Sequence, residues 1–170
     1  MKKIKGEVVK KEKIIMEFFI TGVIGLIIGF ATIWKIFREV MKRDNQEKEK
    51  TISYYRILNQ WLSLKQSKKS VVEFFEKNNY STVAIYGMKE MGERLLEELE
   101  GTGIEVKCVI DQNPVDICKS ITVIHPDNSI PHVDVVVVTA SYYFSEIKNK
   151  LIGKVCGDIV SIDDVVYSKY

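Results

Sequence analysis

Two glycines and a lysine form the chemically most informative pattern of the chain, in the turn Gly87-Met88-Lys89-Glu90-Met91-Gly92. A continuous apolar run precedes the turn and a helical pattern follows it, so the turn joins a strand to a helix. In this setting Gly87 allows a tight turn, and Gly92 allows close packing of the helix on the strand. The unpaired N–H groups at the start of the helix then face a pyrophosphate. We therefore expect these six residues to bind the phosphates of a nucleotide.

Lys89 departs from the G-x-G-x-x-G pattern, which has glycine in the middle so that the backbone can approach the phosphates. A lysine at this position has two readings. Its side chain swings outward and pairs with a phosphate, which preserves binding, or it fills the space and abolishes binding. The sequence leaves both readings open.

Polar residues at the ends of two further strands are the other candidates for ligand contacts. Asp111 closes the second expected strand about 20 residues after the turn, where a carboxylate accepts hydrogen bonds from ribose hydroxyls. Its alternative role is to cap the turn Asp111-Gln-Asn-Pro114. Thr139 and Ser141 follow the fourth strand, at the crevice where open α/β sheets bind ligands. Residues 141–143 either contact a ribose or base there, or cap the next helix.

A catalytic group is hard to find in the chain. The Tyr-x-x-x-Lys pair of short-chain dehydrogenases and sugar epimerases is absent, because Glu146 follows Tyr142 and Ile147 follows Tyr143 at that spacing. The sequence therefore assigns no catalytic residue.

The histidines and one acidic pair have simpler interpretations than catalysis or metal binding. We interpret His125, which precedes Pro126, as a loop residue at the carboxyl end of a strand rather than a general base, and His132 has still less support. Asp163 and Asp164 suit an N-cap for a short helix, and an acidic pair without further ligands predicts no metal site.

Short apolar runs alternate with helical patterns in the C-terminal half. Strands are expected over 82–87, 105–110, 121–124, 134–139 and 158–162, and helices over 91–99 and 144–151. This alternation predicts an α/β fold with a doubly wound, parallel, five-stranded Rossmann-like sheet and right-handed crossovers.

An apolar segment near the N-terminus carries no charged residue from Phe18 to Trp34. Extended to Ile14 and Phe37, a helix of this length spans a hydrocarbon core of about 30 Å. A signal peptide fits less well, because residues 33–36 offer no small-x-small cleavage site. A buried soluble helix fits less well too, because the segment is apolar on every face and flanked by basic clusters. We therefore expect a transmembrane or membrane-inserted helix over 14–37, in contact with lipid.

Gly25 and Gly29 form a GxxxG pattern within this segment. Such glycines let two helix backbones approach closely in a bilayer. The alternative is that membrane helices simply tolerate glycine. A homodimer through Gly25 and Gly29, or through the soluble domain, is therefore one expectation for partners.

The orientation in the membrane is open, because basic residues flank the apolar segment on both sides and the positive-inside rule does not choose between them. Three unpatterned cysteines, without a CxxC pair, fit reduced thiols and so a C-terminal domain facing the cytoplasm. The anchor is either single-pass or re-entrant.

The rest of the chain divides by composition into a basic tail (1–13), a charged linker (38–51), a helical lead-in (52–80) and the nucleotide-fold domain (81–170). In the lead-in, apolar residues recur at helical spacing, namely Ile52, Tyr55, Leu58, Trp61 and Leu62. Trp61 and the pair Phe74-Phe75 are expected to pack against the sheet. The formal net charge of +2 implies no nucleic-acid partner.

The segments VAIYGMKEMGERLLEELE, VIDQNP and VVVVTASYY, with the lead-in from about Tyr54, resemble small NAD(P)-binding Rossmann-like domains of bacterial cell-surface polysaccharide gene clusters. They are also similar to the N-terminal nucleotide-sugar-binding half of sugar acyltransferases of the same pathways. The resemblance implies NAD(P) or a nucleotide-sugar as the cofactor, and polysaccharide-synthesis proteins as partners. Lys89 stands where the family pattern has glycine.

Three functions follow as hypotheses. The first is a membrane-anchored nucleotide-binding module, accessory or regulatory in surface-polysaccharide synthesis. The second is an NAD(P)-dependent or nucleotide-sugar-processing enzyme that a partner subunit completes. The third is a structural interaction protein whose nucleotide site has degenerated.

Overall fold

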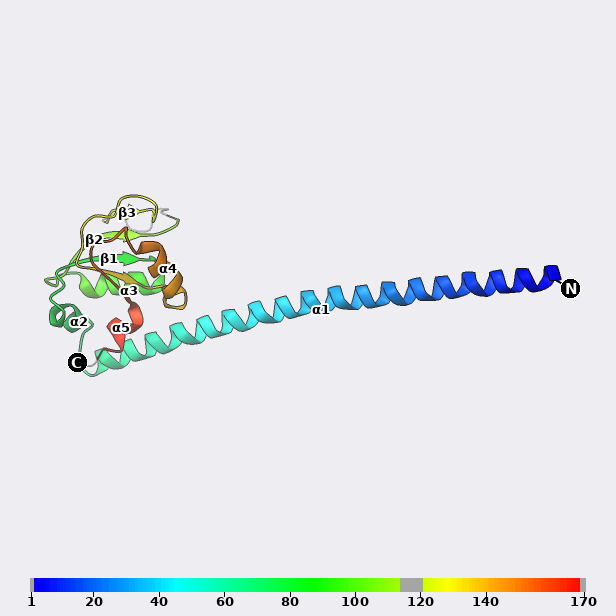
Figure 1. Ribbon diagram of the computed structural model, residues 1–170. Helices are drawn as coiled ribbons and strands as arrows, with labels where there is room; N and C mark the ends of the chain where they lie inside the picture. Colours follow the sequence, from blue (N-terminus) through cyan, green and yellow to red (C-terminus); the bar gives the residue numbers. More distant parts are fainter. Residues whose placement is uncertain (1, 114–120, 169–170) are drawn as a thin grey trace. The chain divides into compact units, whose positions relative to one another are not determined.

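The computed structural model describes residues 2–113 and 121–168 (Figure 1). The chain forms two compact units, Met1–Glu49 and Lys50–Tyr170. The first consists of helix, and the second contains the sheet and all other elements.

The first helix, α1 (Lys2–Gln66), is unbroken through the ranges expected as membrane helix, charged linker and the start of the lead-in. Among the described residues it is the one helix that is long and apolar enough, by length and composition, to cross a membrane. Its most apolar window has a mean hydropathy of 2.0 and no buried residue. Polar residues of the linker extend the helix because Lys and Glu are good helix formers.

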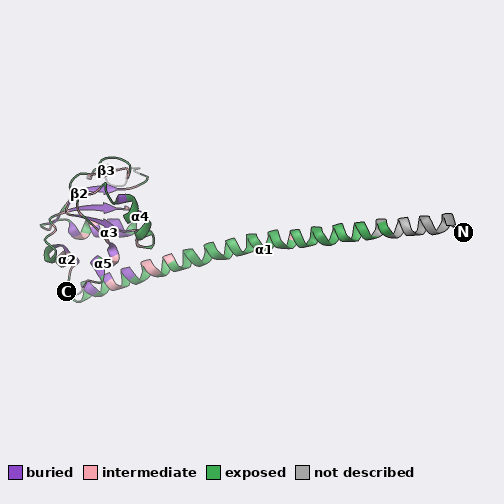
Figure 2. Cartoon of the chain, viewed as in Figure 1, coloured by how far each residue is buried: buried purple, intermediate pink, exposed green. Residues whose placement is uncertain are grey.

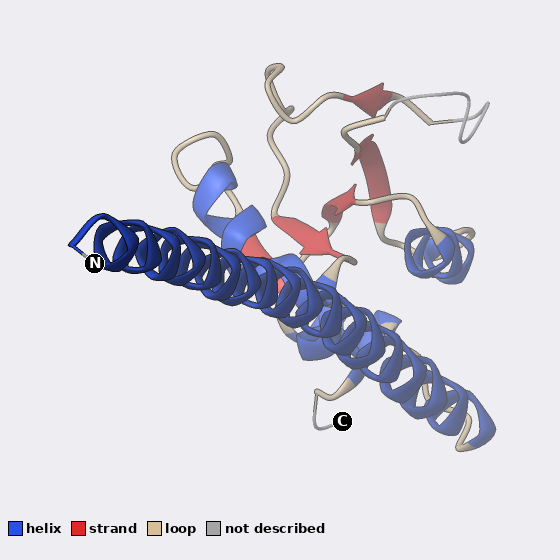
Figure 3. Ribbon diagram, turned by 90° about the vertical axis from the view of Figure 1, so that its right-hand side faces the viewer, coloured by secondary structure: helices blue, strands red, loops and turns tan. Residues whose placement is uncertain are grey.

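The sheet has five parallel strands in the order β3-β2-β1-β4-β5. They are β1 (Thr82–Tyr86), β2 (Glu105–Ile110), β3 (Val123–Ile124), β4 (Val135–Val138) and β5 (Asp158–Ser161). This order, with β1 at the point where the winding direction reverses, is Rossmann-like and confirms the expected fold class. Figure 3 shows the strands in red and the helices in blue.

The strands lie close to their expected bounds, and β1 and β4 are the continuous apolar runs that are typical of strands buried on both faces. All four residues of β4 are buried, as are four of the five in β1. β3 is shorter than expected and pairs with β2 through two residues only.

Helices cover the two faces of the sheet unequally. Alternate strand residues such as Val83 and Ile85 belong to one core, shared with α2 (Val72–Lys77), α3 (Glu90–Leu99), α5 (Ile162–Val166) and the end of α1. The intervening residues, such as Ala84 and Tyr86, belong to a smaller core with α4 (Phe144–Leu151). Figure 2 shows this buried material in the sheet and on one side of the end of α1.

The residues of the lead-in that are buried differ, apart from Trp61, from the apolar residues whose helical spacing was noted in the sequence. Ile57, Trp61 and Leu64 are buried against the sheet domain, together with Phe75 of α2. Trp61 is in the core as expected, but the other four apolar residues of the expected set are exposed: Ile52, Tyr55, Leu58 and Leu62. The helix has two apolar faces, and periodicity alone does not say which one packs.

The N-cap residue of the last helix, α5, differs from the one expected from the sequence. Its N-cap is Ser161, whose Oγ accepts from Asp163 N–H at 3.3 Å, while Asp164 Oδ2 accepts from Ser161 N–H at 3.0 Å. Asp163 and Asp164 therefore lie in the first turn, as in a capping box, and are not the cap. Carboxylates there also favour the positive end of the helix dipole.

Candidate functional site

The glycine turn lies at the carboxyl edge of the sheet, between the end of β1 and the start of α3. Gly87 has a φ of +91°, which other residues rarely adopt. A Cβ atom on Gly92 would lie 2.2 Å from the carbonyl oxygen of Gly87, so the helix approaches the turn more closely than any side chain permits. The backbone therefore requires glycine at both positions, for the two reasons expected from the sequence.

Thr139 braces this turn from the end of β4. Its buried Oγ1 lies 3.0 Å from the carbonyl oxygen of Tyr86 and 2.8 Å from that of Gly87. Because a hydroxyl has one proton, the two carbonyls share it. A Cβ atom on Gly87 would lie 2.8 Å from Thr139 Oγ1. The structure thus places Thr139 beneath the turn, with its donor engaged by the backbone.

Asp111 connects the end of β2 to the same turn. One carboxylate oxygen accepts from the N–H of Met88 at 3.0 Å, and the other accepts from the N–H of Asn113 at 2.9 Å. The second contact is the one expected of a turn-capping aspartate. Each oxygen keeps a further lone pair, so the carboxylate can still accept from a hydroxyl.

Lys89 is the N-cap residue of α3 and its side chain is exposed, as is that of Glu90. Its φ of −83° is open to any residue, so the backbone does not require glycine here. Met88, Met91 and Gly92 are buried. The side chain of Lys89 is therefore open to solvent, and its pairing with a phosphate stays a prediction.

Carboxylates outnumber Lys89 around the start of α3. Lys89 is the cation next to the unpaired N–H groups of the first turn, where an anion would bind. Glu90 and Glu93 lie in the same turn, and Asp111 contacts the glycine turn. The acidic side chains oppose the binding of a phosphate, so binding at this point depends on Lys89.

Ser141 begins a short 3-10 helix, Ser141–Tyr143, at the carboxyl end of β4. Tyr142 and Tyr143 are partly exposed and contact each other edge to face, with ring centroids 5.1 Å apart. The N-cap residue of α4 is Tyr143, and no side chain caps that helix. Ser141 therefore does not cap α4.

A polar crevice of about 510 Å³ opens at the same edge of the sheet, beside α4. It is reached from the ends of β1, β2 and β3, and its lining is Tyr86, Gln112, Asn113, His125, Pro126, Asp127, Lys150, Leu151 and Lys154. Tyr86 and Gln112 are the chain neighbours of Gly87 and Asp111. The crevice therefore adjoins the glycine turn, and its size is that of a small-molecule site.

Ion pairs organise the rim of this crevice. Lys154 Nζ donates to the carbonyl oxygen of Pro126 at 3.1 Å and pairs with Asp127 at 3.2 Å. Lys150 pairs with Glu146 at 2.6 Å, and the hydrogen bond to that carboxylate raises the pKa of the lysine. Both lysine side chains are thus held near the ends of the strands.

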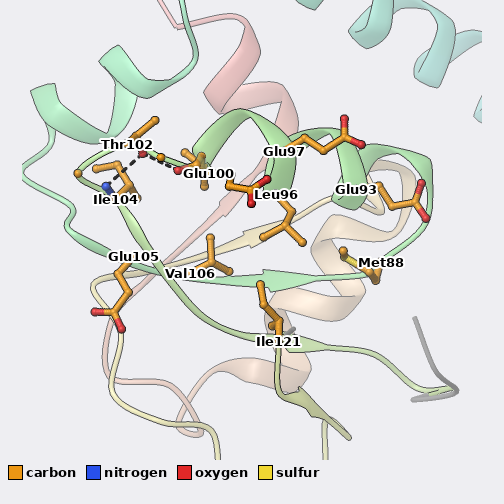
Figure 4. A pocket seen from close by; sticks show the side chains of 13 residues that line it. Met88, Glu93, Leu96, Glu97, Glu100, Thr102, Ile104, Glu105, Val106 and Ile121 are labelled. Atoms are coloured by element: carbon orange, nitrogen blue, oxygen red, sulfur yellow. Dashed lines mark hydrogen bonds between the residues drawn. The ribbon is translucent and has the colours of Figure 1, made fainter. Parts of the chain in front are cut away.

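A second, larger cavity of about 780 Å³ lies beside α3 (Figure 4). Its floor is apolar and includes Leu96, Val106 and Ile121. The charged residues that line it are acidic, namely Glu93, Glu97, Glu100 and Glu105. Among the residues that the structure describes, no lysine or arginine lines it. An anionic nucleotide is therefore disfavoured there.

The other residues considered for chemistry lie apart from the glycine turn. His132 precedes β4, so it lies at the amino edge of the sheet, away from the strand carboxyl ends. Cys108 is buried, which raises the pKa of its thiol to about 11, and Cys156 is exposed. Cys118 lies outside the described residues. Within the described part of the chain no three His, Cys, Asp or Glu side chains could hold a metal ion.

The structure thus joins the turn 87–92, Asp111 and Thr139 by direct contacts, with Ser141 two residues further along. Sequence reasoning missed the crevice residues. Gln112 and Asn113 were detectable, since they directly follow an expected strand. Lys150 and Lys154 carried no signal, because their position depends on how α4 lies across the sheet.

Comparisons with protein-family models, with curated proteins and with solved structures find no match to this chain. The function is therefore argued from the geometry of the carboxyl edge.

Proposed function

We propose that this chain is a membrane-anchored module that binds a nucleotide at the carboxyl edge of its sheet. The observation that carries the proposal is the exposed Lys89 at the N-terminus of α3, on a turn whose backbone requires glycine at positions 87 and 92. A lysine beside unpaired helix N–H groups is a site for phosphate.

The crevice beside the turn supports a ligand larger than phosphate. With phosphates at Lys89, the ribose lies near Asp111, and the base or sugar enters the crevice near Gln112 and Asn113. Amide side chains there offer both donors and acceptors to a base. NAD(P) or a nucleotide-sugar has the required chemistry.

The biological role that we propose is accessory or regulatory, in the synthesis of a cell-surface polysaccharide. The family resemblance supports it, and so does the sequence, which contains no Tyr-x-x-x-Lys pair. In this proposal the apolar part of α1 anchors the chain in the cell membrane and the sheet domain faces the cytoplasm.

Substitution of Lys89 tests the proposal. A charge-assisted contact to phosphate is worth about 1.5–3 kcal/mol, so Lys89→Ala should weaken nucleotide binding by roughly ten- to a hundredfold. Lys107→Ala removes an exposed lysine on β2 that pairs with Glu105 and should leave binding unchanged. Calorimetric titration with NAD, NADP and a UDP-sugar measures the change.

The contacts of Asp111 and Thr139 favour one alternative, a structural protein with a degenerate site. Both side chains form hydrogen bonds with the backbone of the turn itself. If that alternative holds, neither the wild-type chain nor Lys89→Gly gives heat with any of the three ligands. Tighter binding by Lys89→Gly than by wild type would instead mean that the lysine obstructs the phosphates.

A further inference from the structure

Four large apolar side chains lie exposed along the last part of α1. They are Ile52 (42% exposed), Tyr55 (68%), Leu58 (43%) and Leu62 (56%), and they follow one another at intervals of three or four residues. We call these four residues the apolar stripe. Exposed apolar side chains that gather on one helix face indicate an interaction surface.

The sheet domain leaves the apolar stripe uncovered because it packs against a different face of the helix. Ile57, Trp61 and Leu64 form the buried face. At 100° per residue, the centre of the apolar stripe lies roughly 150° around the helix from the centre of that buried face. A partner can therefore contact the stripe without meeting the sheet, and Figure 2 shows exposed residues on this part of α1 beside the buried ones.

The spacing of the apolar stripe is that of a coiled-coil seam. Tyr55, Leu58 and Leu62 occupy successive a, d and a positions of a heptad repeat, and Ile52 flanks them at e. Leucine at such positions inserts between side chains of a facing helix. The stripe therefore fits a second helix rather than a flat surface or a small ligand.

Lipid is a poor candidate to cover the apolar stripe. Ile52 lies roughly 22 Å along the helix beyond Phe37, where the apolar segment ends. The intervening residues 38–50 are rich in both acidic and basic side chains. A stretch of this composition stays in water. The apolar stripe comes after this stretch in the sequence, so it lies outside the lipid as well.

We propose that the apolar stripe pairs with the same stripe of a second copy of this chain, in a parallel two-helix coiled coil. Of the positions that flank the seam, Ile52 and Asn59 at e are exposed and carry no charge, while Tyr54 and Trp61 at g are uncharged and pack against the core of their own chain. Two identical helices therefore meet without like charges facing each other, and no charge pattern selects a different partner. The parallel arrangement rests on the proposed membrane anchor, which gives every copy the same direction.

Single cysteines test this pairing in membranes that contain the full chain. In a parallel symmetric seam each a or d residue faces its own copy, within reach of a disulfide. In a background with Cys118→Ser and Cys156→Ser, we expect Leu58→Cys and Leu62→Cys to form a disulfide-linked dimer under mild oxidation. The matched control is Arg56→Cys, an exposed position of the same helix about 110° from the centre of the stripe, where crosslinking should be several-fold lower.

A second variant measures the contribution of the apolar side chains. Tyr55→Lys with Leu62→Lys places four like charges in the seam of a dimer and should convert it to monomer in sedimentation of the detergent-solubilised chain. Equal crosslinking at Arg56→Cys and Leu62→Cys, or none at both leucine positions, would overturn the pairing. So would a crosslinked product heavier than two copies of the chain. Nucleotide titration of the lysine variant reports separately on the proposed function, because the stripe lies outside the carboxyl edge.

Discussion

At the scale of single residues, two aspartates hold the backbone at opposite edges of the sheet. Asp134 Oδ2 accepts from the N–H and hydroxyl groups of both Ser81 and Thr82, at 2.8–3.0 Å. These bonds tie the start of β1 to the start of β4 at the amino edge. Asp111 does the same at the carboxyl edge through Met88 and Asn113. The pair fixes both ends of the strands that frame the candidate site.

The pKa of Asp134 gives a prediction about acid stability. Hydrogen bonds from the backbone of Ser81, then from Thr82, lower this pKa below its ordinary value of about 3.9. A lowered folded-state pKa adds stability above the unfolded-state pKa, and that stability is lost as pH falls through the folded-state pKa. Urea unfolding should therefore show Asp134→Asn less stable than wild type at pH 7, with the difference shrinking only in strong acid.

A matched control for this experiment is Asp127→Asn, a change in an exposed carboxylate of the crevice rim. Exposed ion pairs contribute little to stability, so its unfolding midpoint should stay near that of wild type. A difference between Asp134→Asn and wild type that stayed constant from neutral to strongly acidic pH would contradict the stated role of the carboxylate.

At the scale of elements, the packing of α3 on the glycine turn sets the geometry of the site. The helix begins at Glu90, and its Gly92 lies against the carbonyl of Gly87. Leu95 and Leu99 of the same helix are fully buried in the main core. A shift of the helix start would therefore move Lys89 and the unpaired N–H groups together.

Replacement of Gly92 should reveal this coupling. A Cβ on Gly92 would lie 2.2 Å from a backbone oxygen, so Gly92→Ala must displace either the turn or α3. We expect a loss of about 1–3 kcal/mol in the free energy of unfolding, as for other overpacked sites. Gly103→Ala is the control, because nothing lies within 4 Å of a Cβ there. Urea midpoints that were equal for the two variants would show that the close contact is absent.

How far the sequence predicts the structure also differs between elements. The strands β1 and β4 are recognisable because both of their faces are apolar and buried, and they lie near their expected bounds. The helical spacing of the lead-in did not identify Ile57 and Leu64 as core residues, because α1 is apolar on two faces there and only tertiary packing decides which face is buried. The crevice escaped prediction for a similar reason, since it forms where α4 lies across the ends of strands remote in sequence.

At the scale of the whole molecule, the chain combines two units with different requirements. The unit Met1–Glu49 is helical and, within its described side chains, exposes its apolar residues, whereas Lys50–Tyr170 has its own core. The end of α1 belongs to that core: Trp61 Nε1 donates to Glu98 Oε2 at 3.3 Å, and Lys65 pairs with the same carboxylate. The boundary between the two units therefore falls within one continuous helix.

Two truncations test this division. Deletion of residues 1–49 removes the apolar segment and keeps Ile57, Trp61 and Leu64, so the remaining chain should be soluble without detergent and unfold cooperatively. Deletion of residues 1–66 also removes those three buried side chains, each worth about 2–5 kcal/mol, which is comparable in sum to the whole stability of a domain. The longer deletion should therefore yield an unfolded or aggregated chain. Fractionation of the intact chain completes the experiment, since an anchor predicts its recovery with membranes. Its recovery in the soluble fraction without detergent would refute the anchor, and a cooperative fold after the longer deletion would refute the assignment of α1 to the core.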